Sequence, residues 1–273
     1  MAAAPTVWPA AVSQRSAGVL GAARRPAAVL GAFPRALYLE VGQSRALLPL
    51  VAPGGLRLPT AVTVASTVVG WGVQPGDQVL VGNGEICLPG VVVRAVRSWR
   101  PVRAPSAEDG RVPDPGAVRV RLPWSDPARR LTDRLQAGED VRSGVAALVG
   151  AGPGLTPSGD DVLCGMLLGL RLAGPAWASL GTVLWRAVQP RLASTTSLSA
   201  ALLAEAAEGY AVPPVVRVAE ALVGGDTAQI AAAVPAVLAI GHTSGADLLG
   251  GLVGALEAFI PHTRRATTLG SLP

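Results

Sequence analysis

A glycine- and proline-rich stretch, residues 149–170, constrains the fold of this chain more than any other segment; it reads VGAGPGLTPSGDDVLCGMLLGL. Gly150, Gly152 and Gly154 permit backbone conformations with positive φ, and the prolines between and after them stiffen the loop. Ser-Gly-Asp-Asp then precedes an apolar run, a pattern typical of a capped helix start with carboxylates in its first turn. Because such a start presents free backbone N–H groups, we expect this loop to favour an anion such as phosphate or a carboxylate.

A second helix start repeats the same chemistry. The sequence SGDDVLCG at residues 158–165 is echoed by SGADLLGG at residues 244–251, and a threonine-containing turn precedes each copy. Two related helices could direct their N-termini into one pocket, with Asp161 and Asp247 in equivalent positions. The alternative is that these polar residues only cap two buried helices, since capping alone enriches Ser, Thr and Asp at such places. The repetition and the glycine-rich loop before it favour a binding site.

Three side chains are candidates for catalysis. Asp161 and Asp247 could fix the NH₂ of a substrate amide, or could only stabilise a helix N-terminus by ~0.3–1 kcal/mol. His242 lies in a Gly-His-Thr-Ser-Gly turn, where it could transfer a proton near neutral pH or be a turn residue bonded to the backbone. The surrounding glycines and hydroxyls could contact substrate or phosphate, or be ordinary caps and turns; these are Gly152, Gly154, Thr156, Ser158, Gly159, Asp160, Thr195, Thr196, Thr243, Ser244 and Gly245.

A metal site is an alternative use of the same acids. Asp160 and Asp161 are adjacent, so their side chains diverge by about 100° on a helix, and we expect Asp160 to cap the helix and Asp161 to face the pocket. Mg²⁺ held by Asp160 and Asp161, with Asp247 nearby, would make the chain a Mg²⁺-dependent hydrolase of a phosphorylated or amide substrate. The chain contains no Lys, which excludes a P-loop lysine.

The motifs resemble the AllH family, formerly catalogued as a domain of unknown function. The resemblance rests on GLTPSGDD at 154–161, on Ser-Thr-Thr at 194–196, and on GHTSG followed by an Asp at 241–247, and it extends more loosely over about 36–260. It implies a subunit of the oxamate carbamoyltransferase of anaerobic allantoin breakdown, which interconverts carbamoyl-oxamate and phosphate with oxamate and carbamoyl phosphate. The implied partners are a small anionic substrate of this kind and the other subunits of the complex.

The resemblance leaves open which subunit carries the chemistry. The sequence lacks the Ser-x-Arg-Thr-Arg and His-Pro-x-Gln patterns of aspartate and ornithine carbamoyltransferases, so a transferase of this kind would use a different scaffold. A non-catalytic assembly or binding subunit is therefore the third alternative, beside the transferase and the hydrolase.

The hydropathy pattern predicts an α+β protein in three parts. Residues 1–35 are rich in Ala, Pro and Arg, and we expect a poorly structured or short helical extension there. Residues 36–125 predict a small antiparallel β-barrel or sandwich-like domain, with strands at about 36–41, 45–51, 60–69, 78–82, 85–88, 91–99 and 116–122. Residues 126–273 predict an all-helical domain, with helices at about 126–148, interrupted at Gly138 and Gly144, and at about 159–173, 176–190, 197–209, 213–223, 226–239 and 245–260.

The composition of the chain limits its possible partners and its cellular compartment. All 23 basic residues are Arg, and residues 1–130 carry 15 Arg against 7 acidic residues, so the first half could attract an acidic subunit or an anionic substrate. No basic helical stripe interleaved with aromatics occurs, and nucleic acid is not an expected partner. The apolar run at 162–184 is interrupted by Arg171 and Pro175, which predicts a buried helix rather than a membrane span. Two cysteines without metal-ligand spacing indicate a reducing cytoplasm.

Overall fold

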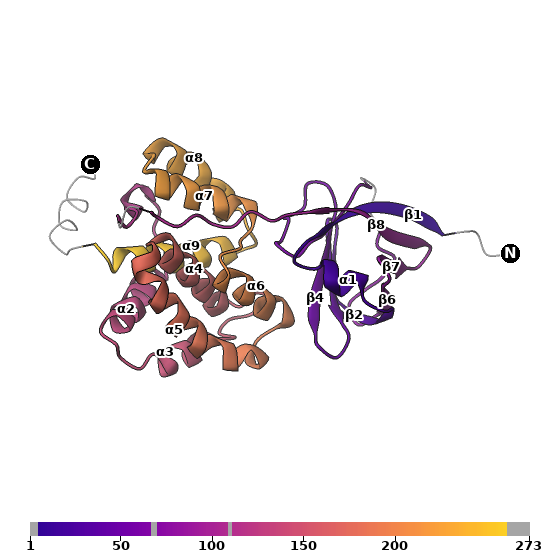
Figure 1. Ribbon diagram of the computed structural model, residues 1–273, viewed down its shortest axis with the longest axis horizontal. Coiled ribbons are helices and arrows are strands. Elements are labelled where there is room, and N and C mark those ends of the chain that lie inside the picture. Colours follow the sequence, from indigo (N-terminus) through magenta and orange to yellow (C-terminus); the bar gives the residue numbers. More distant parts are fainter. Residues whose placement is uncertain (1–4, 67–69, 109–110, 261–273) are drawn as a thin grey trace. The chain divides into compact units, whose positions relative to one another are not determined.

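The chain forms two compact units that divide after Val102. The computed structural model describes residues 5–66, 70–108 and 111–260. The first unit is built from strands and the second from helices (Figure 1), as the α+β prediction requires. The predicted boundary at residue 125 was wrong, because residues 103–124 belong to the helical unit and precede its first α-helix.

The N-terminal unit is a closed barrel with the strand order β1-β5-β4-β3-β2-β6-β7-β8. Most neighbouring strands are antiparallel, but β1 pairs with β8 and β4 pairs with β5 in parallel, so the sheet is mixed and not purely antiparallel. One helix, α1 (Ala17–Gly21), follows the first strand. The strands are β1 (Thr6–Ser13), β2 (Arg25–Phe33), β3 (Ala36–Val41), β4 (Ala46–Val51), β5 (Val62–Val64), β6 (Gln78–Gly82), β7 (Glu85–Leu88) and β8 (Val91–Trp99).

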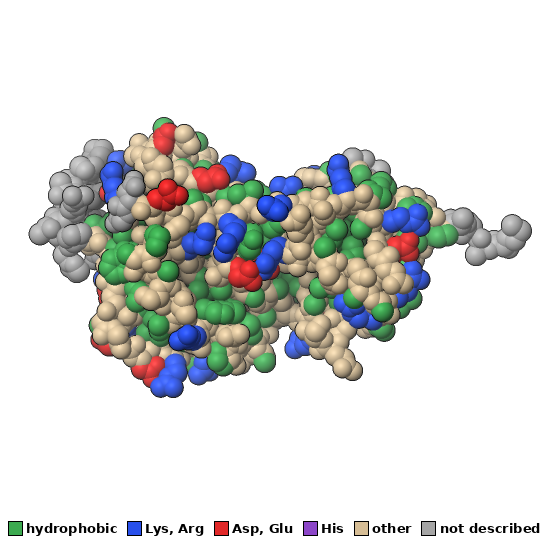
Figure 2. All heavy atoms as spheres, viewed as in Figure 1, with side chains coloured by type: hydrophobic (Ala, Val, Ile, Leu, Met, Phe, Trp, Pro, Cys, Tyr) green, Lys and Arg blue, Asp and Glu red, His purple; other side chains and the backbone are tan. Residues whose placement is uncertain are grey.

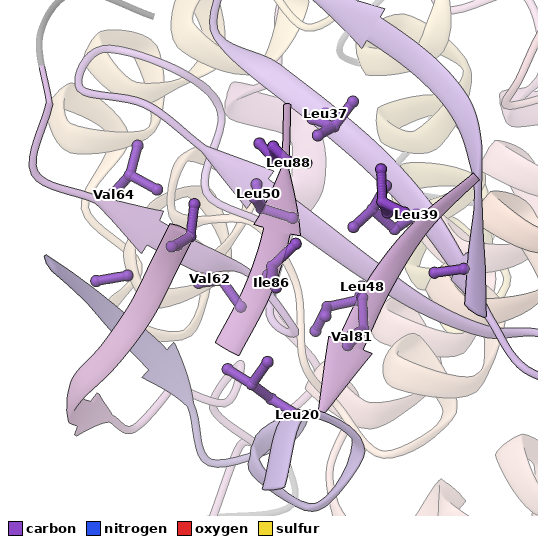
Figure 3. Close-up of a cluster of buried hydrophobic side chains, with 14 of the residues drawn as sticks. Leu20, Leu37, Leu39, Leu48, Leu50, Val62, Val64, Val81, Ile86 and Leu88 are labelled. Carbon is purple, nitrogen blue, oxygen red and sulfur yellow. The ribbon is translucent and has the colours of Figure 1, made fainter. Parts of the chain in front are cut away.

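Alternating side chains fill the barrel. Along β3 every second residue is buried, as expected for a strand with one face on the core. Figure 3 shows Leu37 and Leu39 of β3 beside Leu48, Leu50 and other apolar side chains from the neighbouring strands. The hairpin between β6 and β7 turns at Asn-Gly, whose φ angles are 55° and 79°, as the sequence predicts for a type I′ turn.

The prediction for residues 1–35 was wrong. This segment supplies β1, α1 and β2, and β1 closes the barrel by pairing with both β5 and β8. The buried positions of β1 include Ala10 and Ala11, whose small side chains give little hydrophobic alternation in the sequence. Because β1 lacks a clear hydrophobic alternation, the sequence did not predict the strand that completes the sheet.

Two other predicted strands differ from the structure. The predicted strand at 60–69 is limited to β5, and its residues 67–69 lie outside the described part of the chain. The predicted strand at 116–122 was wrong: the segment begins in a 3₁₀ helix, η1 (Pro115–Ala117), where Asp114 Oδ1 accepts a hydrogen bond from the Gly116 amide. The Asp-Pro-Gly turn thus overrides the β-branched residues that follow it.

The helical unit is organised around two central helices, α4 (Ser158–Leu172) and α9 (Ser244–Glu257), which lie side by side in Figure 1. Its other α-helices are α2 (Ser125–Gln136), α3 (Arg142–Leu148), α5 (Ala178–Val188), α6 (Ser197–Ala207), α7 (Pro213–Gly224) and α8 (Thr227–Leu238), with 3₁₀ turns η2 (Pro175–Trp177) and η3 (Gln189–Ser194). These agree with the predicted helices to within a few residues. Among the residues described, no helix is both long and apolar enough to cross a membrane.

Glycines allow the backbones of α4 and α9 to touch. A Cβ atom added at Gly165 would lie 1.9 Å from the carbonyl oxygen of Leu248, and one added at Gly251 would lie 2.0 Å from that of Val162. Both distances are far below van der Waals contact, so only glycine fits. Gly165 and Gly251 are equivalent positions of the repeated motif, as are Val162 and Leu248, so the two helices cross in a reciprocal manner.

Arginine dominates the charge of the N-terminal unit. Residues 1–102 contain 9 Arg and 3 acidic residues. Figure 2 shows blue arginine side chains over the barrel with few acidic ones on the face in view. Some of this charge is neutralised locally, since Glu85 pairs with both Arg24 and Arg94 at 2.9 Å.

Candidate functional site

The N-termini of α4 and α9 meet at a pair of hydroxyl groups. Thr156 Oγ1, in the turn before α4, lies 2.8 Å from Ser244 Oγ, the first residue of α9. The contact joins residues far apart in the sequence, and it follows from the reciprocal crossing of the two helices. The turn before α6 joins the same region through Thr195 and Thr196, so the three segments at 150–161, 194–197 and 241–247 converge.

Asp160 holds the glycine-rich loop against the turn before α6. Its Oδ1 accepts a hydrogen bond of 2.9 Å from the Gly150 amide, and its Oδ2 accepts one from the Thr195 hydroxyl. The side chain is buried, and the close approach at Gly150, where a Cβ would lie 2.6 Å from the carbonyl oxygen of Ser194, admits only glycine. Asp160 therefore does not cap α4 as expected; it fixes two loops.

Thr196 has two roles in the same junction. As the N-cap of α6 it accepts a hydrogen bond of 3.0 Å from the Ser199 amide, which is the ordinary capping arrangement. Its hydroxyl also donates to the carbonyl oxygen of Leu155 at 2.5 Å, in the loop before α4. Thr195 and Thr196 thus tie the α6 turn to the glycine-rich loop from both sides.

Asp161 and Asp247 are buried acids with unsatisfied oxygens. They are 5% and 4% exposed, and within the described residues the Oδ2 atom of each has no hydrogen-bond partner. Burial raises the pKa of Asp161 to about 7; hydrogen bonds from Ser244 and Thr156 oppose this increase, and the charges of Asp247 and Asp160 add to it. Near neutral pH, Asp161 therefore changes between a carboxylic acid that can donate and a carboxylate that can only accept.

The backbone amides at the start of α4 are already bonded. The Gly159 amide donates to the carbonyl oxygen of Ala151 at 2.9 Å, and the amides of Asp160 and Asp161 donate to that of Pro157 at 3.0 and 3.2 Å. The expectation that these groups are free for an anion was wrong, because the glycine-rich loop folds back and supplies their acceptors. Among the residues described, the Oδ2 atoms of Asp161 and Asp247, rather than these helix amides, lack a hydrogen-bond partner at this place.

The helix starts are not capped by serine. Pro157 precedes α4 and Thr243 precedes α9, and neither position makes a side-chain capping bond. Ser158 and Ser244 instead occupy the first helical position, and Ser244 faces Thr156. The hydroxyl of Ser244 bonds to that of Thr156 in the turn before α4.

Gly159 and Gly245 serve close packing. A Cβ at Gly159 would lie 2.0 Å from the carbonyl oxygen of Leu148, and one at Gly245 would lie 1.8 Å from that of Val237. These equivalent glycines let the chain before each helix lie directly against its first turn. Their presence in the motif is therefore explained by packing alone.

Several predicted site residues lie at the surface. Gly152 and Gly154 are exposed in the loop, and the space beside Gly154, whose φ is 91°, is open. His242 and Thr243 are exposed in the turn before α9, and within the described residues neither side chain makes a hydrogen bond to the acidic pair. His242 is consequently not held in a catalytic position in this structure.

The acids do not form a metal centre in the described part of the chain. No group of three or more His, Cys, Asp or Glu side chains is arranged there to hold a metal ion. Both oxygens of Asp160 are bonded, so the pairing of Asp160 with Asp161 expected for Mg²⁺ leaves one ligand engaged elsewhere. The unsatisfied oxygens of Asp161 and Asp247 are better suited to a hydrogen-bond donor.

Sequence reasoning missed Ser199. Its side chain is fully buried in α6, and its Oγ has no partner among the residues described. In the sequence, Ser199 is recognisable only as the residue three positions after the Thr196 cap. That position predicts the hydrogen bond from the Ser199 amide to the Thr196 hydroxyl, but not the burial of the Ser199 hydroxyl.

Together, the barrel, the helical unit and the paired helices define a two-unit α+β protein with an acidic, hydroxyl-rich cluster where two repeated motifs meet. The family model described as oxamate carbamoyltransferase subunit AllH matches residues 148–256. The match begins at the end of α3, includes all three converging segments and ends within α9, and it confirms the resemblance seen in the motifs. No solved structure matches the chain.

Proposed function

We propose that this chain is a subunit of an oxamate-carbamoyltransferase-like enzyme and that Asp161 and Asp247 bind the amide end of its substrate. The observation that carries the proposal is the pair of buried carboxyl groups, each with an unsatisfied oxygen, on two equivalent helices. The match of the surrounding segment to the AllH family supports the substrate class.

The electrostatics of the pair favour a ligand with both a donor and an acceptor. Two buried acids close to one another do not readily ionise together, and the raised pKa of Asp161 makes it the group that keeps the proton. A neutral Asp161 can then donate to a carbonyl oxygen, and the unpaired Oδ2 of Asp247 can accept an N–H. A primary amide or carbamoyl group presents this complementary pair of atoms.

A ligand of this kind would relieve a cost present in the free protein. An unsatisfied buried polar atom costs about 1–3 kcal/mol, and this cost is removed at Asp161 and Asp247 when a ligand forms hydrogen bonds with both. The anionic end of the substrate would lie toward the exposed loop around Gly154, where the chain leaves open space. Protonation of Asp161 limits the repulsion between the site and that anion.

The same arrangement can assist carbamoyl transfer. In the direction of carbamoyl phosphate formation, a phosphate oxygen attacks the carbamoyl carbon, the bond from that carbon to the oxamate nitrogen breaks, and the nitrogen gains a proton. The Asp161 carboxyl group can donate a hydrogen bond to the carbonyl oxygen as negative charge develops on it. The acid can also supply the proton that the leaving nitrogen requires.

Reconstitution tests this function. The other subunits of a carbamoyltransferase complex are assayed for carbamoyl phosphate formation with the wild-type chain, without it, and with Asp247→Asn. Activity should require the chain and fall at least tenfold with Asp247→Asn, whereas Asp226→Asn, an exposed helix cap, should leave it unchanged. Full activity without this chain would show that it is an accessory subunit.

A further inference from the structure

A separate cavity of about 280 Å³ lies in the helical unit at the other end of α4. Arg171, at the end of α4, is ten residues from Asp161, about 15 Å along the helix, so this cavity is distinct from the acidic pair. At about 30 Å³ per water-sized group, the cavity has room for a small organic molecule. Its lining includes Ser106, Leu167, Leu170, Arg171, Gly181 and Trp185.

The side chain of Arg171 brings a positive charge to this lining. Arg171 is partly buried, and within the described residues its single hydrogen bond runs from Nε to the carbonyl oxygen of Ala104 at 2.8 Å. A guanidinium has five N–H donors, so the N–H donors of the two terminal nitrogens of Arg171 are available to a ligand. The lining, as far as the structure describes it, contains no Asp or Glu to pair with them.

A second arginine strengthens the positive potential. Arg103 donates from Nε to the carbonyl oxygen of Glu208 at 2.8 Å and lies over the Tyr210 ring at 5.3 Å. Burial lowers the pKa of Arg171, repulsion from the positive charge of Arg103 lowers it further, and Tyr210 opposes this decrease. An anion in the cavity would relieve this repulsion.

The chain makes room for the Arg171 head group. A Cβ at Gly209 would lie 2.5 Å from Arg171 Nε, so only a glycine there allows the guanidinium to take its position. Leu167, Leu170 and Trp185 contribute apolar side chains to the same lining. A lining that combines a guanidinium with apolar side chains matches a molecule with a carboxylate and a hydrocarbon body.

We propose that this cavity binds a small carboxylate with an apolar body, which Arg171 holds through its terminal nitrogens. The site is independent of the acidic pair, so it offers the protein a second ligand, separate from the substrate proposed above. The hydroxyl of Ser106 is a further donor at the same wall.

Calorimetry with simple probes tests the proposal. Benzoate and hexanoate should bind the wild-type chain, and benzyl alcohol, which lacks the charge, should bind at least tenfold more weakly. Arg171→Gln should weaken benzoate binding at least tenfold. Gly181→Phe should abolish it by filling the cavity, while Gly181→Ala should not, because a Cβ at this position meets only Leu170 at 3.9 Å.

The variants separate binding from folding. Arg171→Gln also removes the bond to Ala104, so Gly181→Phe on the neighbouring helix is the second test, and thermal unfolding of each variant checks its fold. Oxamate binding at the acidic pair should be unchanged in Gly181→Phe, so the two sites can fail separately. The proposal is overturned if neither carboxylate binds the wild type, or if Gly181→Phe binds benzoate as the wild type does.

Discussion

Asp161 of α4 and Asp247 of α9 are equivalent residues of a repeated motif, and the charge of Asp247 contributes to raising the pKa of Asp161. Their helices start at one place because Gly165 and Gly251 let the two backbones cross in contact. The repeat therefore creates the acidic pair: the same sequence pattern that supplies each acid also supplies the glycine that brings the other acid near.

The helix crossing should not tolerate a methyl group. Gly165→Ala and Gly251→Ala would each place a Cβ against a backbone carbonyl that cannot rotate away, and overpacking of this kind costs about 1–3 kcal/mol or more. Urea unfolding measures the loss. Gly181→Ala is the matched control, since its Cβ has space and Ala is favoured over Gly in a helix by roughly 0.5–1 kcal/mol. Equal stability of Gly165→Ala and the wild type would contradict the described crossing.

The loop junction should depend on the Asp160 carboxylate. Asp160→Ala removes the acceptor of the Gly150 amide and of the Thr195 hydroxyl, and leaving buried donors unsatisfied costs about 1–3 kcal/mol each. Hydrogen exchange at the Gly150 amide should become much faster. Asp226→Asn keeps a capping oxygen at an exposed helix start and should leave that exchange rate unchanged. A protected Gly150 amide in Asp160→Ala would show that another group holds the loop.

Thr196 should stabilise the α6 start through its hydroxyl. Thr196→Ala removes the cap and the bond to Leu155, and loss of a cap alone costs about 1 kcal/mol. Thr196→Ser retains the oxygen and should recover most of the stability measured by thermal unfolding. If serine and alanine were equally destabilising, the methyl group rather than the hydroxyl would be the important part.

Stability should depend on the protonation of Asp161. Its pKa is raised from 3.8 to about 7 by burial, so the folded protein binds more protons than the unfolded chain between these values. The free energy of unfolding should therefore fall as pH rises from about 4 to about 7, and stay low above that. Asp161→Asn removes this titration. The free energy of unfolding of the variant, relative to that of the wild type, should therefore be higher at pH 8 than at pH 5 by at least about 1 kcal/mol. Parallel profiles for the two proteins would contradict a raised pKa.

The helices were predictable from sequence because their apolar runs are long and bounded by proline, glycine and hydroxyl residues. Pro213 starts α7, and the break predicted at Gly138 separates α2 from α3, with a φ of 71°. Gly144, in contrast, lies inside α3 rather than interrupting it. The first strands were missed because β1 has a weak apolar pattern, and its partners are known only once the barrel closes.

The sequence predicted which segments form the site, but not what each residue does there. The repeat indicated that Asp161 and Asp247 belong together and left Asp160 as a helix cap, whereas in the structure Asp160 binds two loops. His242 was singled out by its chemistry, and its exposure could be seen only in the folded chain. The roles depend on long-range hydrogen bonds, which spacing along the sequence does not specify.

Calorimetry with oxamate and pyruvate tests the central claim most directly. The two molecules have nearly the same size and charge, but a methyl group of pyruvate replaces the NH₂ of oxamate, so only oxamate can donate a hydrogen bond to Oδ2 of Asp247. We expect oxamate to bind the chain at least tenfold more tightly than pyruvate, and this preference to disappear in Asp247→Asn. Equal binding of the two molecules, or an oxamate preference that persists in Asp247→Asn, would contradict the proposed recognition of the amide by the acidic pair.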